Sequence, residues 1–354
     1  MDLQMAVALS ILPRRSNPSL LAPASPGHTR AAPGEGKPGL PSGDGVEAFQ
    51  SAWATAGRLI ARAAAADIQP IALGSPEYPV GLASIPDSPP VLWVQGSSQA
   101  LSGVAVAIVG SRSASPYAIE VAERLAFDLA GAGVVVVSGL ARGVDSAAHR
   151  GTIRAGGRTV AVLGSGVDVI YPPEHAGLAA RIAASGAVVS ELPPGAPPRA
   201  LHFPRRNRII SGISLAVVVV EASERSGSLI TARCGLDQGR EVMAVPGNVL
   251  TGRNKGSHGL LKDGAKVVET ADDILEELRL PGRGAGEAVG GRRGEPGDPL
   301  LRAMAPGEAY DFDALMALSG LDGSKLLPRL LHLELEGRLA RVEGGRFVRS
   351  AGKW

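Results

Sequence analysis

With 354 residues, 36 Lys and Arg and 34 Asp and Glu, the chain is long enough for two or three domains, and its near-balanced charge does not by itself indicate a nucleic-acid-binding protein. A single cysteine, Cys234, excludes an internal disulfide and fits a reducing cytoplasm; no Cys/His spacing is typical of a zinc site, and no apolar run reaches the ~20 residues of a membrane-spanning helix. We therefore expect a cytoplasmic protein without membrane insertion, bound metal or cofactor.

The N-terminal part has little regular patterning. Residues 1–45 are rich in Pro, Gly, Ser and Ala without sustained periodicity, which predicts a disordered extension. Residues 46–69 contain an Ala-rich helical pattern, over 46–68. Two proline-bounded turns follow, and then a short strand is predicted at 91–94.

The clearest pattern begins at residue 104. Residues 104–109 are an unbroken apolar run, typical of a central strand covered on both faces. The turn 110–112 follows, Ser115 is a good N-cap, and Pro116 suits the first helical position. A strand, a turn and a helix over 116–131 are therefore predicted, with backbone N–H groups at the helix start that favour an anion.

Beyond this unit, short apolar strands alternate with helical patterns of about ten residues. Such alternation indicates βαβ units and a parallel sheet, so the fold class is α/β. We expect strands at 134–137, 158–163, 187–190, 215–220 and 241–245, and helices near 145–155, 174–184 and 228–238.

The last part of the chain predicts a second, smaller domain. Residues 281–298 have the composition of a flexible linker. Within 299–354, two short helical patterns precede a third helix at 324–336, and two strands follow at 339–342 and 346–348. This order of elements suits a small winged helix.

Small and basic residues follow several predicted strands. Since ligands on parallel sheets bind at the carboxyl ends of the strands, these turns are candidate contacts to an anion, although packing alone also favours glycine at any single turn. They supply the candidate site residues Gly110, Ser111, Arg112, Ser138, Gly139, Arg142, Ser226, Gly227 and Ser228.

The segment 202–212 has the densest positive charge near an aromatic ring. A cationic groove with a ring for stacking is what single-stranded nucleic acid requires. We expect a helix that begins near Asn207, although one of the arginines could instead pair with Glu191 or Glu221. The candidates here are Phe203, Arg205, Arg206, Asn207 and Arg208.

The sequence supports a catalytic site less well than it supports nucleic-acid binding. His149 could act as a base for Ser138 or Ser165, but the chain has no G-x-S-x-G pattern and no P-loop motif. His149 is expected to be a helix residue whose hydrogen bonds are satisfied within the protein, and Asp145 to cap that helix. We therefore predict no enzymatic activity.

Several of these segments together resemble the DprA/Smf family. The matching pieces include Ala107–Arg112, Val137–His149, Ala161–Asp168 with Tyr171-Pro172, Phe203–Gly212, Ser226–Ala232 and Val245–Gly247. The resemblance implies an extended Rossmann-like domain over 70–280, with helices on both faces of the sheet and a C-terminal winged helix over 299–354. Residues 46–69 would be a truncated helical, SAM-like remnant.

The resemblance also implies a function. Members bind single-stranded DNA during natural transformation and load the RecA recombinase, and Arg112, Phe203 and Arg205–Arg208 would line the DNA pocket. It further implies a homodimer, for which 242–245 and Leu260-Leu261 offer an apolar patch.

Two other functions remain open. The first is a nucleotide-processing, phosphoribohydrolase-like enzyme, although the stretch 226–233 lacks the P-G-G-x-G-T-x-x-E pattern of that class. The second is a scaffold that binds only protein, which the arginine cluster argues against.

Overall fold

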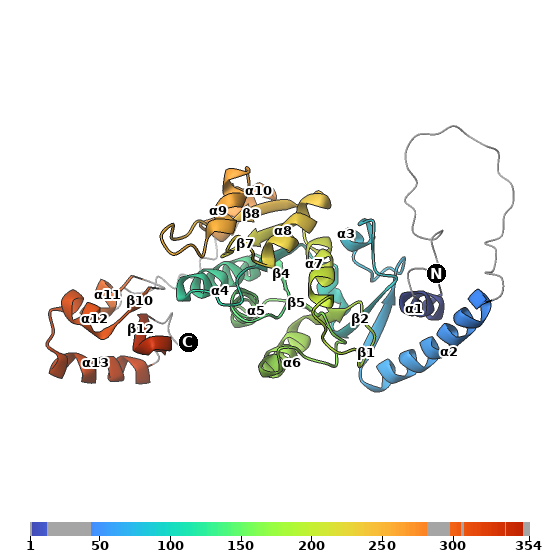
Figure 1. Cartoon of the computed structure of the whole chain (residues 1–354), viewed down its shortest axis with the longest axis horizontal. Helices are drawn as coiled ribbons and strands as arrows, with labels where there is room; N and C mark the ends of the chain where they lie inside the picture. The colour runs from blue at the N-terminus through green and yellow to red at the C-terminus, as the bar shows by residue number, and fades with distance from the viewer. Residues whose placement is uncertain (1, 13–43, 282–297, 306–307, 337, 350–354) are drawn as a thin grey trace.

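The computed structural model describes residues 2–12, 44–281, 298–305, 308–336 and 338–349 (Figure 1). They form a large α/β domain and a small C-terminal domain with a sheet of its own. None of the helices in these ranges is both long and apolar enough to span a membrane.

The α/β domain is built on a nine-stranded sheet with the order β1-β2-β6-β5-β4-β3-β7-β8-β9. All neighbours from β6 to β9 are parallel, whereas β2 is antiparallel to both β1 and β6. The α/β fold with a mostly parallel sheet is therefore confirmed. The strands are β1 (Ile68–Ala72), β2 (Val91–Gly96), β3 (Ala105–Val109), β4 (Val135–Ser138), β5 (Thr159–Val162), β6 (Ala187–Ser190), β7 (Ala216–Val219), β8 (Glu241–Ala244) and β9 (Lys266–Val267).

The strand order changes direction between β3 and β7. From β3 the chain proceeds through β4, β5 and β6 on one side, and through β7, β8 and β9 on the other. Such a reversal opens a crevice at the carboxyl ends of the two central strands, where ligands of open α/β sheets bind. The two strand ends expected to be adjacent are hydrogen-bonded neighbours, with Val109 opposite Val219.

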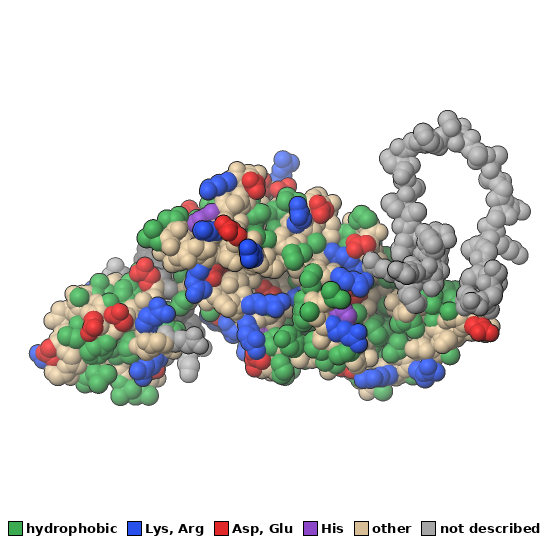
Figure 2. Space-filling view, viewed as in Figure 1, with side chains coloured by type: hydrophobic (Ala, Val, Ile, Leu, Met, Phe, Trp, Pro, Cys, Tyr) green, Lys and Arg blue, Asp and Glu red, His purple; other side chains and the backbone are tan. Residues whose placement is uncertain are grey.

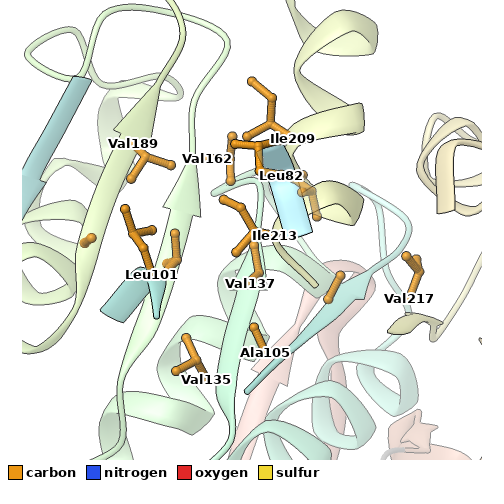
Figure 3. Close-up of a cluster of buried hydrophobic side chains, with 14 of the residues drawn as sticks. Leu82, Leu101, Ala105, Val135, Val137, Val162, Val189, Ile209, Ile213 and Val217 are labelled. Carbon is orange, nitrogen blue, oxygen red and sulfur yellow. The ribbon is translucent and has the colours of Figure 1, made fainter. Parts of the chain in front are cut away.

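Helices cover both faces of the sheet, as expected. Val106 and Ile108 of β3 pack under α4 and α5, while Ala107 and Val109 belong to the cluster under α7. Figure 3 shows α7 side chains over the strands in that second cluster. The helices are α3 (Val80–Ala83), α4 (Pro116–Gly131), α5 (Val144–Arg154), α6 (Ala176–Ser185), α7 (His202–Ile213), α8 (Ser228–Asp237), α9 (Lys255–Lys262) and α10 (Ala271–Glu277).

The first residues of α4 and α7 show how local sequence determines where a helix begins. The α4 start is as predicted, because the Ser115 side chain accepts from the Ala118 N–H and Pro116 is the first helical residue. Helix α7 differs, since it begins at His202 rather than near Asn207. Pro204 then lies in its first turn, where a missing N–H removes no helical hydrogen bond.

The N-terminal part differs from the sequence expectation. Residues 1–45 were expected to be disordered, but Leu3–Ile11 form helix α1, which packs on α2 (Asp44–Ala65). Val7 is fully buried in a cluster with Trp93 of β2. Residues 13–43 lie outside the described part. The sequence also missed β1, whose Pro70 is tolerated because β1 is an edge strand.

Strand β8 does not offer the self-complementary patch that the sequence suggested. It lies between β7 and β9, and Val242, Met243, Ala244 and Val245 are all buried in the core of their own chain. These four side chains are therefore not at the surface, whereas Leu260 and Leu261 of α9, the rest of the expected patch, are partly exposed.

The C-terminal domain has the expected winged-helix order, with a short extra strand. Asp298, placed in the linker from composition, instead caps the first helix by accepting from the Leu300 N–H at 2.7 Å. The linker's other residues, 282–297, lie outside the described part. The elements are α11 (Pro299–Ala303), β10 (Ala309–Tyr310), α12 (Phe312–Ser319), α13 (Gly323–Leu335), β11 (Leu339–Val342) and β12 (Arg346–Arg349).

The packing of α1 predicts that Val7→Asp destabilises the chain. The substitution places a carboxylate among apolar side chains, and we expect it to lower the free energy of unfolding by about 2–4 kcal/mol in a denaturant titration. Leu9→Asp is the matched control, because Leu9 lies on the same helix but outside the cluster. Equal stability of the two variants would show that α1 is not part of the core.

Candidate nucleic-acid interface

A pocket of about 850 Å³ lies at the crevice between β3 and β7. A smaller pocket of about 40 Å³ lies beside it, and the side chains of Arg112, Tyr171 and Phe203 line both. On the face shown in Figure 2, Lys and Arg side chains gather over the middle of the α/β domain. Of the residues expected at the site, the large pocket is lined by Gly110, Ser111, Arg112, Phe203, Arg206, Asn207, Ser226, Gly227 and Ser228.

The turn after β3 is held by its backbone. The Ser111 N–H donates to the Glu221 carbonyl at 2.7 Å, and the Ser111 carbonyl accepts from Val144 N at 3.2 Å. Gly143 makes this approach possible, because its φ is +74° and a Cβ there would lie 2.2 Å from the Ser111 oxygen. The turn therefore presents Arg112 from a fixed backbone.

The anion at the start of α4 is the carboxylate of Glu221. The Glu221 carboxylate accepts from the Ser115 N–H at 3.1 Å and from the Ser115 hydroxyl at 2.6 Å. Glu221 is 2% exposed. The anion that the sequence analysis placed at this helix start is thus a side chain of the protein, which is favourable at the positive end of a helix.

Phe203 lies beside both a cation and a second ring. The Arg112 guanidinium carbon is 5.5 Å from the centre of the Phe203 ring, within cation–π range. The Tyr171 ring is 5.4 Å from it at an interplanar angle of 46°. Tyr171 is 40% exposed. The sequence analysis missed Tyr171 as a site residue, although the dipeptide Tyr171-Pro172 was among the family motifs.

Arg206 is directed into the protein. Its guanidinium donates to the Gly139 carbonyl at 2.8 Å and to the Val162 carbonyl, so it joins α7 to the ends of β4 and β5. Burial lowers the pKa of Arg206 to about 10, which leaves it charged at neutral pH. Burial also raises the pKa of Asp145, an effect that the charge of Arg206 and hydrogen bonds from Ala141 N and Gly139 N oppose.

Arg208 confirms the alternative that one arginine pairs with Glu191. Its side chain is 10% exposed, with Nη2 2.7 Å from Glu191 and Nε 2.6 Å from Asp87. Asn207, one residue earlier, donates to the Gly227 carbonyl at 3.3 Å and so connects α7 to the turn before α8. The guanidinium groups of Arg206 and Arg208 therefore bind protein atoms, not a free position over the pocket.

Of the other candidate site residues, some lie at the surface and some in the core. Arg205 is exposed and lines neither pocket. Arg142 lines the small pocket and pairs with Glu174 at 2.5 Å on the surface. Ser138 is buried and donates to the Ile108 carbonyl at 2.6 Å. Gly139 also lines the small pocket.

Arg253 is a further cation at the large pocket that the sequence analysis missed. It comes from the loop after β8 and donates from Nη1 to the Ser113 carbonyl at 2.7 Å. No local pattern marked this residue, because its contact spans 140 positions of the chain. Arg112 and Arg253 thus bring two cations to the mouth of one pocket.

The catalytic arrangement considered from sequence does not assemble. The hydroxyls of Ser138 and Ser165 each donate to a backbone carbonyl at 2.6 Å. His149 is fully buried, with Nδ1 2.7 Å from Thr159 Oγ1, and burial lowers its pKa to about 3. Within the described residues, no cluster of three or more His, Cys, Asp or Glu side chains could hold a metal ion.

The inward position of Arg206 predicts that Arg206→Ala lowers stability. The change leaves two buried carbonyls and the Asp145 carboxylate without their cation, and we expect a loss of about 2–5 kcal/mol in denaturant unfolding. Arg205→Ala, at the exposed neighbouring position, should change stability by less than about 0.5 kcal/mol. Equal stability of the two variants would contradict the structural role of Arg206.

The same variant should have a distinct pH dependence. Burial holds the folded-state pKa of Asp145 above its usual value, and loss of Arg206 raises that pKa further. A carboxyl with a raised folded pKa loses stability as the pH rises through that pKa. The stability deficit of Arg206→Ala should therefore be smaller in acid than at neutral pH, and a deficit that grew in acid would contradict this assignment.

Comparison with known proteins identifies the family. Residues 69–279 match the model of DNA recombination-mediator protein A, and residues 294–345 match the DprA winged helix domain. Protein Smf of Escherichia coli is 42% identical over 280 residues, covering 77% of this chain and 75% of that protein. The DNA processing protein DprA of Bacillus subtilis is 44% identical over 222 residues, covering 62% and 75%.

Two solved structures share the fold. The X-ray structure of DprA from Streptococcus pneumoniae superposes with a TM-score of 0.61 at 36% identity, covering 67% of this chain and 83% of that one. A structure of DNA processing protein A from Helicobacter pylori, described for its single-stranded DNA binding mode, gives a TM-score of 0.54 at 28% identity, covering 60% and 96%. The chain therefore belongs to the DprA/Smf family of DNA recombination-mediator proteins.

Proposed function

We propose that this chain binds single-stranded DNA, without base specificity, at the pocket between β3 and β7. The observation that supports this most directly is the group formed by Arg112, Phe203 and Tyr171, which offers a cation and two rings at the pocket mouth. Single strands need both, because their phosphates are charged and their bases are exposed for stacking. The Helicobacter pylori relative, whose structure concerns single-stranded DNA binding, supports the same ligand.

The phosphates would be held by the arginines that remain accessible. Arg112 and Arg253 lie at the large pocket, Arg142 at the small one, and Arg205 on the exposed side of α7. Charge-assisted contacts to phosphate oxygens carry no sequence information, so the binding would be general. Ser226, Gly227 and Ser228, at the start of α8, would add hydroxyl and N–H donors.

The bases would stack on Phe203 and Tyr171. The Arg112 guanidinium lies near the Phe203 ring. A base that stacked on the same side would displace the guanidinium, which could then bind the adjoining phosphate. Arg206, Asn207 and Arg208 would act as positioning residues, because they fix α7 against the strand ends and thereby orient Phe203.

Family membership supports a proposal for the wider role. We propose that the protein acts in the cytoplasm, protects DNA strands that enter during natural transformation and loads RecA recombinase onto them. It would act as a homodimer and without catalysis of its own. Because β8 is buried, the dimer surface must lie elsewhere than at 242–245.

Substitutions at the pocket separate charge from stacking. Arg112→Ala should weaken binding to every sequence alike and flatten the log–log salt dependence by roughly 0.7, the value for one lost phosphate contact on a single strand. Phe203→Ala should cost about 1–3 kcal/mol and leave that slope nearly unchanged. Fluorescence anisotropy on labelled single strands across a salt series measures both quantities.

Controls make this experiment decisive. Arg181→Ala removes an exposed cation of α6 that lines neither pocket, and it should bind nearly like the parent chain. Equal or better binding to a duplex of the same length would refute the single-strand proposal. A parallel assay for base release from nucleoside monophosphates tests the phosphoribohydrolase-like alternative, and activity there would favour that enzyme.

We also expect the winged helix to be dispensable for strand binding. Its core is separate, since Leu300, Leu315, Leu330 and Phe347 pack among residues of their own domain. A chain that ends at Leu280, which packs on the α/β core, should keep its affinity for a single strand within a factor of about three, or less than 1 kcal/mol. A folded shortened chain with a much larger loss would contradict this.

A further inference from the structure

The charged residues of the winged-helix domain are divided by sign along its sequence. Residues 298–336, which contain α11, α12 and α13, carry seven Asp and Glu against three Lys and Arg. Residues 337–354, which contain the hairpin of β11 and β12, carry five Lys and Arg against one acid, Glu343. The side chains of the first part therefore have a net charge of −4 and those of the second part +4, with His neutral. A polyanion that approached this domain would be attracted to the hairpin.

The cations of α13 are paired within the domain. Lys325 pairs with Asp322 at 3.5 Å. Arg329 pairs with the buried Asp298 that caps α11. In helix-turn-helix proteins the corresponding helix lies in the major groove and contacts base edges. The exposed Leu331 of α13 offers no hydrogen bond to a base, so this helix is poorly suited to such a contact.

The hairpin of β11 and β12 presents two cations near its tip. The strands are antiparallel, with Arg341 opposite Phe347 and Val342 opposite Arg346. Opposite residues point to the same face and successive residues alternate, so Arg341 and Arg346 lie on opposite faces of the hairpin. Both side chains are exposed, and neither forms an ion pair with a residue that the structure describes. These two guanidinium groups are therefore available to an external anion.

Two glycines form the turn between these cations. Gly344 and Gly345 have φ of +80° and +70°, in the left-handed region that favours glycine. A Cβ added at Gly344 would lie 3.8 Å from Arg346 Nε, and one added at Gly345 would lie 3.9 Å from Arg341 Nη2. The tip is therefore narrow, and an arginine reaches it from each face.

This tip suits a duplex better than a single strand. Single strands need an exposed ring on which bases can stack. Phe347 is the one aromatic residue of 338–349, and it is 6% exposed, with the Arg341 guanidinium carbon 5.7 Å from its ring centre. The minor groove of duplex DNA is about 6 Å wide, and its negative potential attracts arginines, most strongly where A·T-rich sequence narrows it. A narrow tip with two guanidinium groups is complementary to that groove.

We propose that the hairpin tip of the winged-helix domain binds the minor groove of duplex DNA through Arg341 and Arg346. This site goes beyond the proposed single-strand function and is separate from the pocket between β3 and β7. Its sequence preference would be coarse, because the minor groove distinguishes A·T from G·C pairs and little else.

Fluorescence anisotropy with labelled duplexes tests the proposal on the full-length chain. Arg341→Ala and Arg346→Ala should each weaken binding to an A·T-rich duplex by about fivefold or more, and should reduce its preference over a G·C-rich duplex. Arg346→Ala leaves the contact between Arg341 and Phe347 in place, so a loss shared by both variants is not a packing defect. Lys325→Ala, the matched control, removes an exposed cation of α13 and should bind nearly like the parent chain.

Three results would overturn the proposal. Duplex binding that is unchanged in both hairpin variants would mean that another molecule, such as an acidic protein surface, uses these cations. A loss in Lys325→Ala as large as that in Arg346→Ala would place the duplex on α13. Equal losses of single-strand and duplex binding in the hairpin variants would indicate general phosphate contacts. Arg112→Ala should weaken single-strand binding and spare duplex binding, so the two proposals can fail independently.

Discussion

The buried guanidinium of Arg206 is the contact on which the site depends. It links α7 to the carbonyls of Gly139 and Val162, and so holds one helix against the ends of two strands. A buried cation is costly unless its hydrogen bonds and a counter-charge are nearby. Asp145 supplies the counter-charge, while its carboxylate also accepts from the Gly139 N–H at 3.1 Å. The turn after β4, the start of α5 and α7 are therefore fixed together.

Much of the α/β domain could be predicted because its signals are local. An apolar run followed by a glycine, a serine cap and a proline specifies one strand and one helix within about 25 residues, and the Ser115 cap formed as expected. Helix α1 could not be predicted in this way. Its helical pattern is short, and it is stabilised by contacts with α2 and with the strands β1 and β2, which are distant in the sequence.

The candidate site was predictable as a region but not residue by residue. Composition alone could not show which arginines of the segment 202–212 face outward, because neighbours on a helix point 100° apart. Arg205 is exposed, whereas Arg206 is 5% exposed and Arg208 is 8% exposed. The partner Asp87 lies 121 positions away, beyond the reach of any local pattern. Charge density therefore located the region of the site, but two of the three arginines in the segment are internal and the helix begins five residues earlier than expected.

The crevice between β3 and β7 explains why the accessible charge is positive. Two strand ends meet there, one followed by Arg112 and the other by Glu221. Equal and opposite charges would cancel over an open pocket, yet Glu221 is turned to the start of α4, where the Ser115 N–H and hydroxyl bind it. The helix dipole stabilises the Glu221 carboxylate at this position, and the carboxylate therefore does not pair with Arg112. Arg112 is thus left without a carboxylate partner among the described residues, and its guanidinium lies over an aromatic ring at the pocket mouth. A polyanion with stacked rings is complementary to such a surface, whereas a neutral ligand would leave the cation unpaired.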